Sequence, residues 1–312
     1  MLSGIDIGGT KCAVVSGLSD GTVKEKIRFE TASCEATLNK IFDAVDKLGC
    51  GDAIGISCGG PLDEKRGIIQ SPPNLPGWDN VHIVDILKER YGVPVAIRND
   101  ANACALAEWK FGAGKGTENM VFMTFGTGLG AGLILNGKLY GGSSGLAGEI
   151  GHIRLSDVGP AGYGKIGSFE GFCSGAGLYE LGRTMAREYL QRGVSPEFIK
   201  NGDINSFSVA EMADAARRGD ECASRTFELC ATMLGRGLAI ISDILDPELI
   251  IIGSVYARCR DLLEERAVFE LRREALNKSV RITVPDLGES IGDVAALAVA
   301  ADLIKEEKNE AY

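Results

Sequence analysis

The stretch LSGIDIGGTKCAVV, residues 2–15, decides the fold class of this chain. It begins as a short apolar run, breaks at Gly8-Gly9-Thr10 and resumes with β-type residues, which predicts two strands joined by a tight glycine turn. The same pattern returns at 120–135, where an apolar run meets the glycine-dense TFGTGLGAG and a further apolar run follows. This near-duplication predicts two similar strand–turn–strand segments in an α/β chain.

The rest of the chain alternates between strand-like and helix-like patterns. Short buried runs bounded by glycine or proline alternate with apolar residues at helical spacing, and the chain is mostly helical from Ser174 onward. The predicted strands are 53–58, 93–98, 249–252 and 280–284. The predicted helices are 35–48, 81–90, 99–111, 209–218, 221–245, 260–277 and 293–305, with a loop at 67–78.

Length and composition limit the classes of function. A chain of 312 residues favours two domains, and its formal net charge of −10 disfavours nucleic acid or membrane as the main partner. We expect no signal peptide, because no basic region precedes an apolar stretch, and no transmembrane helix, because no run approaches ~18 apolar residues. The nine cysteines are dispersed without CxxC spacing, which indicates reduced thiols in the cytosol.

The two glycine turns are candidate phosphate sites. A turn of small residues exposes backbone N–H groups that can hold a phosphate, and a threonine hydroxyl adds a donor. Asp6, just before the first turn, is placed to bind Mg²⁺ directly or through water. The alternative is two hairpin turns without a ligand, since such turns are common. The P-loop pattern GxxxxGK[ST] is absent, and β-type residues follow GTGLGAG, which argues against a dinucleotide-binding fold.

A second candidate is RNDAN at 98–102, where a predicted strand ends and a helix begins. Ligands collect at that edge of open α/β sheets. Asp100 can there accept the proton of a sugar hydroxyl as the hydroxyl attacks phosphorus. The alternative is a helix N-cap formed by Asn99 or Asp100.

The third candidate is Glu149-Ile150-Gly151-His152. His152 is one of only two histidines in the chain, and an acid and a histidine on either side of a glycine can both reach a polyol. The alternative is a structural histidine whose hydrogen bonds are satisfied within the protein.

Six motifs together resemble the ROK family, which groups bacterial glucokinase-like sugar kinases with related repressors. They are, in the family's order, DIGGTK at 6–11, NLPGW at 74–78, NDANA at 99–103, TFGTGLGAG at 124–132, GEIGH at 148–152 and IIGS at 251–254. The resemblance covers essentially the whole chain and implies a two-domain actin/hexokinase-like (ribonuclease H-like) fold. The N-terminal lobe would be 1–117 with a C-terminal helix at 296–312, and the C-terminal lobe 118–295 would include a helical dimerisation region.

The resemblance further implies an ATP- and Mg²⁺-dependent hexose kinase that is a cytoplasmic homodimer. Asp100 would be the general base for the C6 hydroxyl of glucose or of a related hexose or N-acetylhexosamine. The sugar would be bound or bordered by Gly60, Pro61, Asn74, Asn99, Glu149, His152 and Glu170. The nucleotide would be bound by Gly8, Gly9, Thr10, Lys11, Gly126, Thr127, Gly128 and Gly253. Ser254 stands where the family has a glycine-rich run, which leaves the nucleotide preference open.

One segment departs from the family pattern. Similar kinases follow the histidine motif with CGCGxxGCxE, whose cysteines join the histidine in binding zinc. Here 161–170 is AGYGKIGSFE, so alanine, tyrosine and serine replace the three cysteines. Zinc needs about four sulfur, imidazole or carboxylate ligands. We therefore predict no zinc site and expect Tyr163 and Phe169 to hold the loop by packing.

Two other functions stay open. A repressor of the same family would carry a helix-turn-helix domain ahead of the sugar-binding part, whereas the phosphate motif here begins at Asp6. A non-catalytic sugar-binding or sugar-sensing protein is favoured by the missing cysteines and disfavoured by Asp6, Asp100 and both glycine turns.

Overall fold

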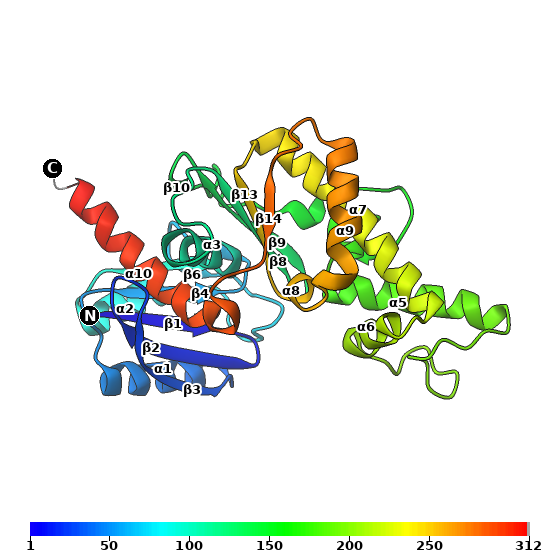
Figure 1. Ribbon diagram of the computed structural model, residues 1–312. Coiled ribbons are helices and arrows are strands. Elements are labelled where there is room, and N and C mark those ends of the chain that lie inside the picture. The colour runs from blue at the N-terminus through cyan, green and yellow to red at the C-terminus, as the bar shows by residue number, and fades with distance from the viewer. Residues whose placement is uncertain (311–312) are drawn as a thin grey trace. The chain divides into compact units, whose positions relative to one another are not determined.

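The computed structural model describes residues 1–310 and contains two compact units (Figure 1). The first unit comprises Met1–Phe122, Gly132–Ala147 and the chain from Pro285 onward, and the second comprises Met123–Ala131 and Gly148–Val284. Residues 311–312 of the predicted C-terminal helix lie outside the described residues. Of the helices described, none is both long enough and apolar enough to cross a bilayer.

The first unit is built on a five-stranded sheet with the order β3-β2-β1-β4-β7. Its strands are β1 Leu2–Ile7, β2 Lys11–Gly17, β3 Val23–Glu30, β4 Ile54–Cys58 and β7 Val95–Asn99. β1 is antiparallel to β2 but parallel to β4, and β4 is parallel to β7. The register aligns Ile7, Cys58 and Asn99, so the carboxyl ends of three parallel strands meet at one edge.

Helices pack on both faces of this sheet (Figure 1). The other elements of the unit are α1 Cys34–Leu48, β5 Leu62–Asp63, β6 Ile68–Ile69, α2 Ile83–Tyr91, α3 Asp100–Phe111, β10 Lys138–Leu139, η2 Gly288–Ser290 and α10 Ile291–Glu310. Ile5 and Ile56 are buried in one core cluster with side chains of α1 and α2. Because side chains alternate along a strand, Gly4 and Gly55 lie on the opposite face, and their lack of a Cβ lets the α10 backbone approach at Ala296.

The second sheet has the order β10-β9-β8-β13-β14. Its further strands are β8 Met120–Phe125, β9 Leu129–Leu135, β13 Leu249–Ile252 and β14 Arg281–Thr283. The boundary between the two units falls within β8 and β9. β8, the turn and β9 form the second strand–turn–strand segment that the sequence predicts.

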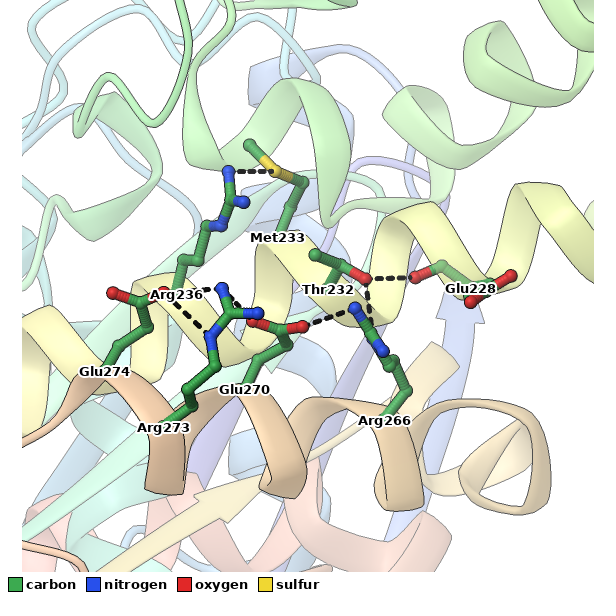
Figure 2. Close-up of polar contacts among 8 residues, drawn as sticks. All are labelled: Glu228, Thr232, Met233, Arg236, Arg266, Glu270, Arg273 and Glu274. Carbon is green, nitrogen blue, oxygen red and sulfur yellow. Dashed lines mark hydrogen bonds and ion pairs between the residues drawn. The ribbon is translucent and has the colours of Figure 1, made fainter.

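Helices make up most of the second unit. Its other elements are η1 Ile150–His152, β11 Ala161–Gly162, β12 Lys165–Ile166, α4 Phe169–Phe172, α5 Gly175–Gln191, α6 Val209–Arg217, α7 Glu221–Leu245, α8 Val255–Arg258 and α9 Arg260–Glu274. α7 and α9 approach closely at Gly235, where a Cβ would lie 2.5 Å from Glu270 Cβ. Glu270 is fully buried and pairs with Arg266 and Arg273 of its own helix, and Arg266 donates a hydrogen bond to Thr232 on α7 (Figure 2). This cluster links the two helices.

The α/β class predicted from the sequence is confirmed, with local differences. Strand β3 was not predicted, because its sequence VKEKIRFE is charged and largely exposed at the edge of the sheet. The helix expected at 260–277 ends at Glu274, since Ala275 is already extended. The loop at 67–78 contains strand β6.

Candidate active site

The first glycine turn joins β1 to β2 and is closed by its own backbone. The Gly8 N–H donates to the Lys11 carbonyl at 3.1 Å, and Thr31 Oγ1 donates to the Gly8 carbonyl at 2.6 Å. A Cβ at Gly8 would lie 2.7 Å from the Lys11 carbonyl oxygen, so the turn requires a glycine there. Gly9 and Thr10 are exposed. The turn is therefore a small-residue tip, open to solvent on a fixed base.

Asp6 lies two residues before this turn, and its carboxyl group is largely buried. Burial, followed by the negative charges of Asp293 and Asp100, raises the pKa of Asp6 to about 6, against the lowering effect of Lys26 and Arg28. Lys26 Nζ pairs with Asp293 Oδ2 at 2.5 Å. Lysine and arginine thus neutralise the negative charge around Asp6 only in part. A divalent cation bound there would be stabilised by the remaining negative charge.

The NLPGW loop contacts the first turn. Leu75 and Trp78 are buried in the core of the first unit and anchor the loop, while Asn74 is exposed. A Cβ at Gly9 would lie 2.5 Å from the Asn74 carbonyl oxygen. The structure therefore brings Asn74 beside the tip of the turn.

Asp100 is the first residue of α3, directly after the end of β7. Asn99 caps this helix, because its side-chain oxygen accepts the Ala101 N–H at 2.8 Å, which confirms the predicted N-cap. The exposed Asp100 carboxylate is favoured at a helix N-terminus, where the backbone dipoles present partial positive charge. A Cβ at Gly60 would lie 3.5 Å from Asn99 Nδ2, so the loop after β4 reaches the same place.

The second glycine turn, between β8 and β9, is held by the start of α5. The Gly126 N–H donates to the Gly128 carbonyl at 3.0 Å. The first two N–H groups of α5, from Gly175 and Ala176, donate to the carbonyls of Gly126 at 2.7 Å and Thr127 at 3.4 Å. These are N–H groups that have no partner within their own helix. The carbonyl groups of the turn thus accept N–H groups at the start of α5, and these hydrogen bonds hold the turn in place.

Glu170 braces the same turn from the side. Its Oε2 accepts the Leu129 N–H at 2.9 Å, and a Cβ at Gly128 would lie 2.7 Å from that oxygen. Glu170 belongs to α4, which Ser168 caps by accepting the Gly171 N–H at 3.1 Å. A residue expected to contact sugar is therefore also part of the support of the second turn.

The GEIGH segment packs on β9 through its glycines. Gly148 has a φ of +92°, and a Cβ there would overlap the Ala131 carbonyl. A Cβ at Gly151 would overlap the Leu129 carbonyl. Glu149 and His152 are exposed on this closely packed backbone. Glycine at 148 and 151 thus lets the backbone that carries Glu149 and His152 lie directly against β9.

His152 is contacted by the segment 161–170, in which the sequence predicts no zinc site. The Tyr163 ring meets the His152 ring edge-on, with 5.4 Å between the centroids, and Lys165 Nζ donates to the His152 carbonyl at 2.5 Å. Phe169 is fully buried in the room left by Gly237. Within residues 1–310, no group of three or more His, Cys, Asp or Glu side chains is placed to hold a metal ion.

Gly253 follows β13 and returns to the second turn. Its N–H donates to the Met123 carbonyl at 3.0 Å. Ser254 next to it has a φ of +56°, a left-handed conformation that favours glycine, and a Cβ at Gly126 would lie 3.8 Å from Ser254 Oγ. The serine thus keeps the backbone that a glycine would adopt and adds a hydroxyl near the turn.

The predicted site residues fall into two groups, one in each unit. The first group is Asp6, Gly8, Gly9, Thr10, Lys11, Gly60, Pro61, Asn74, Asn99 and Asp100, and the second is Gly126, Thr127, Gly128, Glu149, His152, Glu170 and Gly253. Three charged residues near the first group were not predicted from the sequence: Asp293 and Lys26, which act on Asp6, and Glu64, which accepts the Asn99 N–H. Asp293 and Lys26 have no local signal, because an acid at a helix start and a lysine on an exposed strand are common on any surface. Glu64 lies in a loop without a periodic pattern.

The chain matches the ROK family over residues 2–307. It is 32% identical over 308 residues to a glucokinase of Streptomyces coelicolor, with 97% of each chain covered. It is 31% identical to a xylose repressor of Caldicellulosiruptor bescii, with 78% of this chain and 61% of the repressor covered. A crystal structure of a ROK family glucokinase from Streptomyces griseus in complex with glucose and AMPPNP matches with a TM-score of 0.77 and 31% identity, over 96% of this chain and 99% of that one.

Proposed function

Because the chain belongs to the ROK family and is a sugar kinase with the actin/hexokinase-like fold, we propose that it transfers the γ-phosphoryl group of ATP to a hexose, with Asp100 as the general base. The acceptor is the C6 hydroxyl of glucose or of a related hexose or N-acetylhexosamine. The similar glucokinases, and the neighbour solved with glucose and AMPPNP, support this pair of substrates.

One observation carries the proposal: the position of Asp100. It follows β7 at the edge where the first glycine turn also leaves the sheet, and it starts a helix. Burial is the main reason why the pKa values of Asp6 and of the Cys58 thiol are raised, and the negative charge of Asp100 raises both further. A carboxylate, a phosphate-type turn and a candidate cation ligand therefore share one small region of the first unit.

These residues have to position the two substrates and to accept one proton. Phosphoryl transfer needs in-line placement of the two oxygens and neutralisation of charge. Asp100 accepts the proton of the attacking hydroxyl. Gly8, Gly9, Thr10 and Lys11 bind phosphate in the first unit.

The residues of the second unit take the complementary roles. Gly126, Thr127 and Gly128 bind phosphate, and Gly253 borders the adenosine. Glu149, His152 and Glu170 hydrogen-bond the sugar hydroxyls, as Gly60, Asn74 and Asn99 do from the first unit.

Mg²⁺ fits the region of Asp6. The carboxylate is buried among like charges, and lysine and arginine neutralise them incompletely. A single protein carboxylate is a usual contribution to an Mg²⁺ site in which phosphate oxygens and water supply the other ligands. A bound Mg²⁺ ion would neutralise part of the negative charge of the phosphate groups.

The test is a coupled assay of ADP release with a panel of hexoses and N-acetylhexosamines, run with ATP and with GTP. We expect saturable turnover with ATP and at least one hexose. Sugar binding by calorimetry without ADP release from any member of the panel would contradict the proposal. That result would support the alternative, a non-catalytic sugar-sensing protein, which the similarity to a xylose repressor also favours.

Cellular location, oligomeric state and zinc content can each be measured separately. The nine cysteines are free, which supports a reducing, cytoplasmic location that fractionation of the source cells can test. We expect a homodimer, which sedimentation equilibrium can test. Metal analysis of the purified protein should find no stoichiometric zinc, since alanine, tyrosine and serine supply no zinc ligands at 161, 163 and 168.

A further inference from the structure

Glu64 links the loop after β4 to the start of α3. It lies in the turn between β5 and β6, and its side chain is 16% exposed. Oε1 accepts the backbone N–H of Asn99 at 2.7 Å and the Nδ2 group of Asn102 at 3.0 Å. Oε2 lies 3.9 Å from Arg98 Nε. One carboxylate therefore contacts three of the five residues of the 98–102 segment.

The segment needs such an acceptor because of its place in the fold. β7 is the edge strand of the first sheet, so only one of its sides has a strand partner, and an N–H on the other side needs a different acceptor. The Asn99 N–H finds it in Glu64. A hydrogen bond to an ionised acceptor is roughly twice as strong as one between neutral groups. Glu64 thus fixes the backbone at the turn from strand to helix.

The position of this backbone sets the position of the base. Asp100 follows Asn99 directly, and its own Oδ1 lies 2.8 Å from the Ala101 N–H, so its carboxylate moves with the first turn of α3. A displacement of about 1 Å at a reacting group can cost about 10²-fold in rate. On the proposed function, we propose that Glu64 is a positioning residue: its carboxylate clamps the β7–α3 junction and thereby holds Asp100 in place for proton transfer.

The experiment compares Glu64→Ala and Glu64→Gln with Lys65→Ala as the matched control. Lys65 is the exposed neighbour on the same turn and bonds only the Ser143 carbonyl in the contacts described. Glu64→Gln keeps a side-chain oxygen that can accept the Asn99 N–H, whereas Glu64→Ala leaves that group without an acceptor. We expect Glu64→Ala to lower kcat by about 10- to 100-fold with the KM for the hexose changed by less than about threefold. Glu64→Gln should stay within about fivefold of wild type, and Lys65→Ala should match wild type.

Two results would overturn the proposal. One is a Glu64→Ala kcat equal to that of the Lys65→Ala control. The other is an equal loss in Glu64→Ala and Glu64→Gln that follows a common fall in Tm, because this would mean that the carboxylate only stabilises the fold. If Glu64→Ala does not fold, Glu64→Asp replaces it, since its shorter side chain withdraws the acceptor by one methylene. A Glu64→Asp kcat equal to wild type then counts against the proposal.

Amide hydrogen exchange separates this proposal from the proposed function. Exchange at Asn99 and Ala101 should be faster in Glu64→Ala than in wild type, and close to wild type in Glu64→Gln. If wild type turns over no sugar, the kinase reaction is wrong, but exchange still decides whether Glu64 holds the junction. Unchanged exchange in Glu64→Ala would refute the clamp even in an active enzyme.

Discussion

The two glycine turns each join two neighbouring strands of a sheet, but they differ in the charge that precedes them. Asp6 stands two residues before Gly8, and Thr124 stands in the same place before Gly126. Thr124 Oγ1 accepts the Gly130 N–H at 3.1 Å and so closes its own hairpin. Asp6 instead is largely buried and lies near the charges of Asp293, Asp100, Lys26 and Arg28. The comparison teaches that the two turns differ in the residue that precedes them: a largely buried acid in the first unit, and in the second a threonine that closes its own hairpin.

The turns also differ in what supports them. A Cβ at Gly9 would meet the backbone of Asn74, which cannot yield without moving the NLPGW loop. A Cβ at Gly128 would meet Oε2 of Glu170, the end of a side chain that can rotate away. A methyl group at Gly9 is therefore harder to accommodate than one at Gly128.

The largest expected effect tests whether the first unit carries the chemistry. Asp100→Asn should lower kcat by about 10²–10⁴-fold, because the amide cannot accept the hydroxyl proton, and should leave the calorimetric Kd for the sugar largely unchanged. Asp85→Asn is the matched control, since Asp85 is also an exposed acid in the first turn of a helix. A wild-type kcat in Asp100→Asn would remove Asp100 from the mechanism.

The next effect tests the difference between Asp6 and Thr124. The folded protein holds the Asp6 proton more tightly than the unfolded chain, so its contribution to stability is present below about pH 4 and lost as the pH rises through about 6. The shift from 3.8 to about 6 corresponds to about 3 kcal/mol. Asp6→Asn has no titratable carboxyl group at this position, so it does not lose stability in this way as the pH rises. Its free energy of unfolding in urea, relative to wild type, should increase between pH 4 and 6 and level off above that range, while its turnover falls.

The control for this prediction is Thr124→Val, which removes the hydroxyl at the equivalent place of the second turn. Its difference from wild type should not change with pH, because a threonine does not titrate in this range. A pH-independent difference for Asp6→Asn would show that Asp6 has an ordinary pKa.

A smaller effect compares the two turns directly. Gly9→Ala forces a methyl group against backbone and should cost about 1–3 kcal/mol, seen as a lower Tm and an increase of about tenfold in the KM for ATP. Gly128→Ala should cost less, because Glu170 can move, although the Leu129 N–H then loses its acceptor. Measuring Tm and KM for both variants checks the order. A larger loss in Gly128→Ala would reverse the expected order of the two positions.

The smallest effect concerns how the second unit orients its histidine. Tyr163→Ala removes the ring that meets His152 edge-on and should increase the KM for the hexose by a few-fold, because such a ring contact is worth about 0.5–1.5 kcal/mol at most. Tyr163→Phe keeps the ring and should match wild type. Equal KM values for Tyr163→Ala and wild type would mean that the backbone of 148–152 orients His152 unaided.

Much of the fold could be predicted because its signals are local. The helix at 221–245 has the bounds expected from apolar periodicity, and both strand–turn–strand segments follow from runs of apolar residues broken by glycine. β3 was missed because its first half, VKEK, is mostly charged and only Ile27 and Phe29 alternate with exposed residues. The candidate site was predictable where a motif carries it, as at Asp100 and His152, but the contacts of Glu64 and Asp293 join residues far apart in the chain.

The amino-acid sequence by itself determined the α/β class, the two glycine turns, the family and the absence of the zinc cysteines, because each is a matter of residue type and short-range spacing. Only the tertiary structure decided that Asp6 is surrounded by like charge, that Glu170 braces a turn and that Glu64 reaches the start of α3. Those properties depend on burial and on distances between segments that are far apart along the chain, and no local pattern contains such distances.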